Sequence, residues 1–246
     1  MTVAEDILSL TKNGTIHFSL LDPDKQDPEV AGDIAKIAEL SGSSAIMVGG
    51  STLTSQKQVD ETVKCIKENT ALPVILFPSR AKYLSKYADA VFFMSLLNSR
   101  NLDFVVREHV KGAYFVKKSD IEPISMGYVI VEPGMTVGKV GEADLIKKDD
   151  VDSAVGYALA AQYFGMKFFY LEAGSGADFP VSNKIIQGIK KNVDIPVIVG
   201  GGILDEKTAK EKAKAGADII ITGTALEKEK NLEKTLQSII NGIKGI

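Results

Sequence analysis

The stretch IPVIVGGGI at residues 195–203 is followed closely by ADIIITGTAL at residues 217–226, and the two have the same form. Each is a short apolar run, rich in β-branched residues, that leads into glycine. Such runs are typical of parallel strands that are buried on both faces. An earlier pair, LPVILFPSR at 72–80 and ADAVFF at 88–93, repeats the pattern. The repetition predicts similar β-strand–helix–β-strand units, although such units resemble one another in any α/β fold.

Apolar runs and helical patterns alternate along nearly the whole chain. The predicted strands are residues 16–21, 45–48, 74–77, 90–94, 128–131, 167–171, 197–199 and 218–222. Helical periodicity is clearest at residues 29–40, 56–68, 152–164, 183–192 and 206–215. Eight strands in 246 residues predict a single (β/α)8 TIM-barrel domain spanning residues 1–246. The boundaries between 96 and 124 stay open, and a doubly wound open sheet is the alternative fold.

The composition narrows the class of protein. A net charge of -3 and a pI near 5.6 argue against nucleic acid as a main partner. The single cysteine, Cys65, excludes an intramolecular disulfide and fits a reducing cytoplasm. The N-terminus carries Glu5 and Asp6 and lacks the apolar core of a signal peptide. We therefore expect a soluble cytoplasmic protein.

Glycines follow the seventh and eighth predicted strands, where barrel enzymes often bind phosphate. Without a Cβ, glycine lets backbone amides approach an anion closely. The predicted phosphate ligands are Gly201, Gly202, Gly223 and Thr224, with the Thr224 hydroxyl as an additional donor. A tight turn alone would also explain the glycine run, but its pairing with the second glycine loop favours a phosphate site.

The sixth predicted strand ends in YLEAGSGA, residues 170–177, which places a carboxylate directly before a glycine loop. Glu172 would lie beside the phosphate site, where it can orient substrate hydroxyls and accept a proton. Gly174, Ser175 and Gly176 would supply amides and a flexible wall. An ion pair between Glu172 and a lysine or arginine of the barrel is the alternative reading.

Two oxygen ligands follow the first and second predicted strands. Asp22 and Ser51 suit Mg²⁺, which takes few protein oxygens and completes its shell with water and phosphates. An aspartate before proline is also an ordinary turn former, so the residues alone leave both readings open. Lys25 would meet a second phosphate or lie in solvent.

Other chemistries find no support in the sequence. His17, His109 and Cys65 are too few and too scattered to form a zinc site. The acids within residues 147–155 suit the first turn of a helix. No GxSxG motif is present for a hydrolase nucleophile.

Together, these loops resemble the geranylgeranylglyceryl phosphate synthase family, barrel prenyltransferases that make the first ether bond of archaeal-type membrane lipids. The resemblance covers essentially the whole chain and is carried by LLDPDK (20–25), VGGSTL (48–53), YLEAGSGA (170–177), VGGGI (199–203) and TGTAL (222–226). A related bacterial family that makes a heptaprenyl analogue has lysine two residues before the metal-binding aspartate. This chain has Leu20 there, which favours the geranylgeranyl branch.

The resemblance implies a complete site. It implies Mg²⁺ at Asp22 and Ser51, geranylgeranyl diphosphate as donor, and a homo-oligomer. It implies sn-glycerol 1-phosphate bound by Tyr170, Leu171, Glu172, Ala173, Gly174, Ser175 and Gly176, with its phosphate on Gly201, Gly202, Gly223 and Thr224. Glu172 would then hold the attacking 3-hydroxyl and take its proton.

The prenyl tail needs an apolar groove, which the ill-defined middle of the chain would line or cover through Leu96, Leu97, Phe104 and Tyr114. Two other functions share the phosphate site. A phosphosugar isomerase or aldolase is one, but an aldolase lysine is lacking, because Lys167 opens the sixth strand at the wrong end. A non-catalytic sensor of a phosphorylated ligand is the other, and it leaves Asp22 and Ser51 without a purpose.

Overall fold

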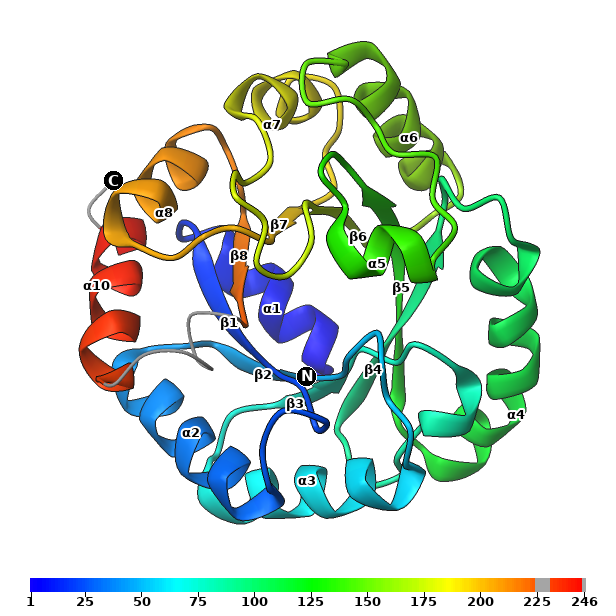
Figure 1. Cartoon of the computed structure of the whole chain (residues 1–246), viewed down its shortest axis with the longest axis vertical. Helices are drawn as coiled ribbons and strands as arrows, with labels where there is room; N and C mark the ends of the chain where they lie inside the picture. Colours follow the sequence, from blue (N-terminus) through cyan, green and yellow to red (C-terminus); the bar gives the residue numbers. More distant parts are fainter. Residues whose placement is uncertain (224–230, 245–246) are drawn as a thin grey trace.

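The computed structural model describes residues 1–223 and 231–244, and within them eight parallel strands close into a barrel (Figure 1). The strands are β1 (Ile16–Leu21), β2 (Ala45–Val48), β3 (Val74–Leu76), β4 (Ala90–Leu96), β5 (Glu122–Ile130), β6 (Phe168–Glu172), β7 (Val197–Gly200) and β8 (Ile219–Thr222). Each pairs with the next along the chain, and β1 pairs with β8. The predicted TIM-barrel fold is confirmed.

Helices form a ring around the barrel (Figure 1). The ring consists of α2 (Pro28–Ser41), α3 (Gln56–Asn69), α4 (Glu108–Ser119), α6 (Val151–Tyr163), α7 (Asn183–Lys190), α8 (Glu206–Lys214) and α10 (Leu232–Lys244). Three shorter elements belong to the connections that follow β3, β4 and β5: η1 (Ala81–Tyr83), the π-helix η2 (Asp103–Arg107) and α5 (Met135–Val140), which lies inside the ring in Figure 1. Side chains cap the N-termini of several, as Ser55 does for α3 and Asp205 for α8. No helix in the described part of the chain is long and apolar enough to cross a bilayer.

Alternate residues of each strand point inward and outward, as the two-residue period of a strand requires. Phe18 and Tyr170 belong to the cluster that fills the barrel. Residues an odd number of positions away face outward: Leu21, three residues after Phe18, packs against α2, and Leu171, next to Tyr170, packs against the helices around β6. The inward positions of β6 therefore include both Tyr170 and, two residues on, Glu172.

The N-terminal end of the barrel is closed by α1 (Val3–Thr11), which the sequence analysis did not predict. Ala4 and Ile7 are buried in the inner cluster. The backbone amides of Val3 and Ala4 donate to the carboxylate of Glu122, the first residue of β5, at 2.6 and 3.2 Å. In Figure 1 this helix is visible through the centre of the ring. Only the opposite end, where the strands terminate, is left for a ligand site.

The largest difference from the predicted elements lies in the middle of the chain. β5 begins at Glu122, whereas the predicted strand begins at 128. The sequence did not indicate this first half, EPISMG, because it mixes polar residues, proline and glycine with apolar ones and has no simple strand pattern. Residues 103–119, left open by the sequence, form the continuous segment η2–α4. Elsewhere the predicted ends differ from the observed ones by at most two residues.

Candidate active site

Glu172 ends β6 with its carboxylate held at both oxygens. The Tyr170 hydroxyl donates to Oε2 and the Gly174 amide to Oε1, each at 2.5 Å. The side chain is 7% exposed. Burial raises the pKa of the Glu172 carboxyl above its ordinary value, while the two hydrogen bonds oppose this shift. Burial also raises the pKa of Tyr170 well above 10, which keeps its hydroxyl protonated as a donor.

The glycine run after β7 makes room for this carboxylate. A Cβ at Gly200 would overlap the Tyr170 hydroxyl, and one at Gly201 would lie 2.5 Å from Oε1 of Glu172 and 2.7 Å from the Gly174 amide. Gly201 also has a φ of 80°, which favours glycine. Within the described residues Glu172 makes no ion pair with lysine or arginine, so the alternative reading of this residue is not observed. Gly200 and Gly201 are therefore required by the close approach of β6 and β7 as well as by the predicted phosphate site.

The loops after β6, β7 and β8 meet around a small pocket, here called the glycine cup. The predicted ligands that line it are Tyr170, Glu172, Ser175, Gly201, Gly202 and Gly223. Leu171 and Ala173 face outward into the core beneath the helices, and Gly174 contacts the site through its amide. Gly176 is not among the lining residues. Thr224 lies outside the described residues.

Asp22 and Gly50 come together from the loops after β1 and β2. The Asp24 amide donates to Oδ1 of Asp22 at 3.1 Å. A Cβ at Gly50 would overlap the Asp22 carboxylate, which therefore lies directly against the residue before Ser51. The described residues contain no cluster of three or more carboxylate, histidine or cysteine ligands. A single carboxylate beside the loop that carries Ser51 is still an oxygen ligand of the kind that suits Mg²⁺, which takes few ligands from the protein.

A larger apolar pocket opens beside Gly50 and Ser51. It runs between the ends of β3 and β4 and the elements η1, η2, α4 and α5, and its apolar lining includes Phe77, Leu84, Phe93, Leu96, Phe104, Tyr128 and Val137. Leu96 and Phe104 were predicted for this role. Leu97 instead packs against the outer cluster around β5 and β6, and Tyr114 is 81% exposed on the far side of α4.

Three aromatic rings join the two pockets. The ring of Tyr128 lies 5.0 Å from that of Tyr170, and Phe77 lies 5.4 and 5.7 Å from the two. Phe77 and Tyr128 line the apolar pocket, whereas Tyr170 lines the glycine cup. Sequence reasoning missed Phe77 and Tyr128, because each reads as one more apolar residue of a strand. The structure thus places the glycine cup, which contains the Glu172 carboxylate, and the apolar pocket on two sides of one aromatic cluster.

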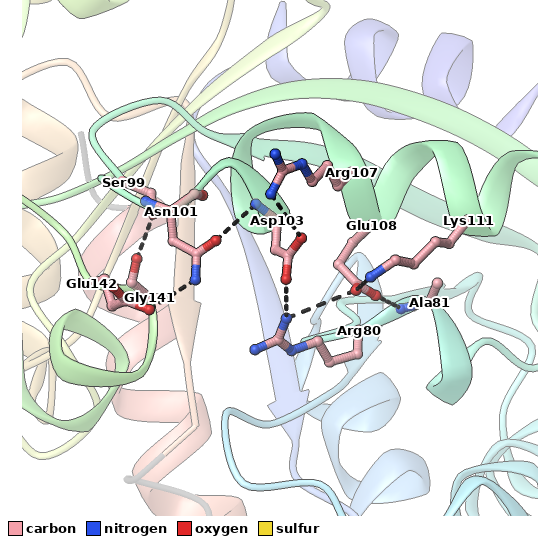
Figure 2. A network of polar contacts seen from close by, with 10 residues as sticks. All are labelled: Arg80, Ala81, Ser99, Asn101, Asp103, Arg107, Glu108, Lys111, Gly141 and Glu142. Carbon is pink, nitrogen blue, oxygen red and sulfur yellow. Dashed lines mark hydrogen bonds and ion pairs between the residues drawn. The ribbon is translucent and has the colours of Figure 1, made fainter.

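Ion pairs form the rim of the apolar pocket (Figure 2). Arg80, from the loop after β3, approaches Asp103 of η2 at 3.6 Å and Glu108 of α4 at 3.7 Å. Its guanidinium also lies 4.3 Å from the centre of the Phe104 ring. Glu108 in turn accepts from the Ala81 amide at 2.7 Å and from Lys111 at 2.6 Å. This network ties the segment η2–α4 to the loop after β3.

A second set of contacts ties the residues just before that segment to the end of α5 (Figure 2). Asn101 donates to the Glu142 carboxylate at 2.8 Å, and Ser99 donates to the Gly141 carbonyl at 2.6 Å. Because Gly141 lines the apolar pocket, these bonds hold two of its walls together.

The chain matches the PcrB family over residues 8–243. The geranylgeranylglyceryl phosphate synthase of Picrophilus torridus is 51% identical to it over 243 residues, covering 99% of this chain and 100% of that protein. A crystal structure of (S)-3-O-geranylgeranylglyceryl phosphate synthase from Thermoplasma acidophilum in complex with its substrate sn-glycerol-1-phosphate has a TM-score of 0.98 at 47% identity and covers both chains fully. The wild-type enzyme of Thermoplasma volcanium has a TM-score of 0.97 at 49% identity, covering 100% of this chain and 99% of that one.

The sequence match spans nearly the whole chain, and the match in structure covers the whole of both chains. On this evidence the chain belongs to the PcrB family and, within it, to the geranylgeranylglyceryl phosphate synthases.

Proposed function

We propose that this protein is a prenyltransferase that joins geranylgeranyl diphosphate to the 3-hydroxyl of sn-glycerol 1-phosphate. The products are geranylgeranylglyceryl phosphate and diphosphate, so that the first ether bond of an archaeal-type lipid is formed. One observation carries the proposal: a glycine cup with a buried carboxylate adjoins an apolar pocket across the Phe77, Tyr128 and Tyr170 rings. A polar phosphate ester and an apolar tail need this combination.

The glycine cup suits the acceptor. Backbone amides of Gly201, Gly202 and Gly223 would receive the phosphate, as glycine loops at this end of a barrel commonly do. The glycerol would then extend toward Glu172. The carboxylate would accept a hydrogen bond from the 3-hydroxyl and take its proton as the new bond forms. Its fixed orientation favours this role, since a positioned base needs no reorientation during the reaction.

The apolar pocket suits the donor. Its tail would lie among Phe93, Leu96 and Phe104, with its diphosphate near Asp22 and Ser51 at the pocket entrance. Mg²⁺ held there would neutralise charge on the departing diphosphate. The bond between C1 and the diphosphate oxygen breaks, C1 bonds to the glycerol oxygen, and the proton passes to Glu172.

Turnover with a choice of acceptors tests the proposal. The purified protein is incubated with Mg²⁺, geranylgeranyl diphosphate and either sn-glycerol 1-phosphate or its 3-phosphate enantiomer, and ether product is sought by mass spectrometry. Product from the 1-phosphate alone is expected. Absence of product from both would reject the reaction and favour a non-catalytic phosphate sensor, which would still bind the acceptor.

A further inference from the structure

Apolar side chains form an exposed stripe along the outer face of η2–α4. Leu102, Val106, Val110 and Tyr114 are 53%, 48%, 71% and 81% exposed. They recur every four residues, the spacing that keeps side chains on one side of a helical segment. Single exposed apolar residues are ordinary, but a continuous stripe over several turns indicates an interaction surface.

The inner side of the same segment forms a wall of the apolar pocket. Phe104, His109 and Gly112 line that pocket. The imidazole Nε2 of His109 donates to the carbonyl of Met94 on β4 at 2.6 Å, which fixes the segment against the barrel. Only one helix therefore separates the pocket from the stripe.

Basic residues accompany the stripe. Arg107, Lys111, Lys117 and Lys118 are all exposed. The acids of the segment, Asp103 and Glu108, are shared among Arg80, Arg107 and Lys111 (Figure 2). The chain as a whole has a net charge of -3, so this basic character is local.

We propose that the outer face of η2–α4 docks on an anionic lipid bilayer. The apolar stripe would enter the interface between headgroups and acyl chains, while the lysines and arginine contact lipid phosphates. The biological purpose of this docking rests on the proposed function. The product of that reaction has an apolar tail, and it would leave the apolar pocket directly into the membrane on which the outer wall of the pocket lies.

Charge favours a membrane over a second copy of the chain. In a twofold dimer the same patch faces itself. Arg107 and Lys111 are paired with Asp103 and Glu108, but Lys117 and Lys118 of one copy would approach the basic residues of the other, and such like-charge contact costs several kcal/mol. An anionic surface meets the same residues with attraction.

Flotation with vesicles tests the docking surface without requiring turnover. The full-length protein is mixed with vesicles of phosphatidylcholine alone or with phosphatidylglycerol added. We expect binding to the anionic vesicles, weaker binding to phosphatidylcholine, and release in high salt. The double variant Val110→Ser/Tyr114→Ser should reduce the bound fraction by at least about fivefold. The variant Lys117→Gln/Lys118→Gln should weaken binding to anionic vesicles only.

A matched control comes from the end of α6, where Tyr163 and Phe164 are 78% and 72% exposed. Tyr163→Ser/Phe164→Ser should bind vesicles as the wild type does. Failure of the wild type to bind anionic vesicles would overturn the proposal, as would equal losses from the two serine pairs. The proposal would also be overturned if light scattering gave a lower molecular mass for Val110→Ser/Tyr114→Ser than for the wild type. That result would show that the stripe joins copies of the chain. Turnover of the wild type in detergent-free buffer reports separately on the proposed reaction.

Discussion

The hydroxyl of Tyr170 and the carboxylate of Glu172 form a buried hydrogen bond of 2.5 Å between two residues on the same side of β6. The tyrosine ring belongs to the aromatic cluster that joins the two pockets, and the carboxylate faces the glycine cup. The pair therefore fixes a base at the point where acceptor and donor would meet. Burial makes this carboxylate more basic than an exposed glutamate, which suits proton removal.

Replacing the carboxylate tests its role directly. Glu172→Gln keeps the shape and can still bond to Tyr170, but it cannot take a proton. We expect kcat to fall by about 10²- to 10⁴-fold, the usual contribution of a general base. Binding of sn-glycerol 1-phosphate, measured by calorimetry, should change little, since we propose that its phosphate binds to Gly201, Gly202 and Gly223. Near-normal turnover would remove Glu172 from the mechanism.

The pH dependence of kcat should report the same group. Only ionised Glu172 accepts the proton, so activity falls as pH drops through its pKa, which burial has raised above the ordinary 4.5. Tyr170→Phe removes a hydrogen bond that stabilises the ionised form, so the acid limb should move to higher pH. A pH–rate profile of both proteins checks this. If the acid limb of Tyr170→Phe stayed at the same pH or moved to lower pH, Glu172 would not be the group that titrates.

Gly50 controls the position of Asp22. A Cβ at Gly50 would overlap the Asp22 carboxylate, so Gly50→Ala must displace it. If Asp22 holds Mg²⁺, the Mg²⁺ concentration for half-maximal activity should rise by about 10- to 100-fold, as when other supporting residues of a metal site are changed. Gly156→Ala is the control, because a Cβ there meets nothing within 4 Å. If both variants needed the same Mg²⁺ concentration for half-maximal activity, Asp22 would not be a ligand of the metal.

The sequence predicted the parts of this site that depend on chain order. Strand ends are visible as apolar runs that stop at glycine or a carboxylate, and parallel strands deliver those residues to one edge of the barrel. The glycine cup and the pairing of the loops after β1 and β2 follow from that rule. The helix α1 was missed because what holds it, packing in the barrel and hydrogen bonds to Glu122, comes from residues far away in the sequence.

The apolar pocket was the least predictable part. Leu97 and Phe104 look equivalent in sequence, but Leu97 packs beneath the helices and Phe104 enters the pocket. Leu97 directly follows Leu96 of β4 and faces the opposite side from it, whereas the side that Phe104 faces depends on how η2–α4 is tied to its neighbours. Those ties are ion pairs between distant residues, such as Arg80 with Asp103, and no local pattern reports them.

Arg80 should therefore affect the donor more than the acceptor. Its two ion pairs and its stacking on Phe104 together amount to about 1–2 kcal/mol, or roughly tenfold in binding. Arg80→Ala should raise KM for geranylgeranyl diphosphate by about that factor and leave KM for sn-glycerol 1-phosphate within about twofold. Arg100→Ala is the control, since its pair with Asp144 is exposed at the surface. Parallel rises in both KM values would assign Arg80 a general structural role.

His17 should make the barrel sensitive to acid. Its ring bonds Ser43 and Thr222 at 2.9 Å each, in the layer outside β1, and burial lowers its pKa from 6.5 to about 3. Between these two values the unfolded chain binds a proton that the folded chain excludes. The free energy of unfolding should thus fall as pH drops through this range, by up to about 1.4 kcal/mol per pH unit from this group.

His17→Gln keeps a donor and an acceptor but does not titrate. Urea unfolding at several pH values between 7 and 4 should give a shallower decline in stability for the variant than for the wild type. Carboxylates contribute equally to both proteins, so the difference between the two curves isolates the imidazole. Parallel curves would show that His17 takes up its proton in the folded barrel as readily as in the unfolded chain, and the buried ring would not be the acid-sensitive element.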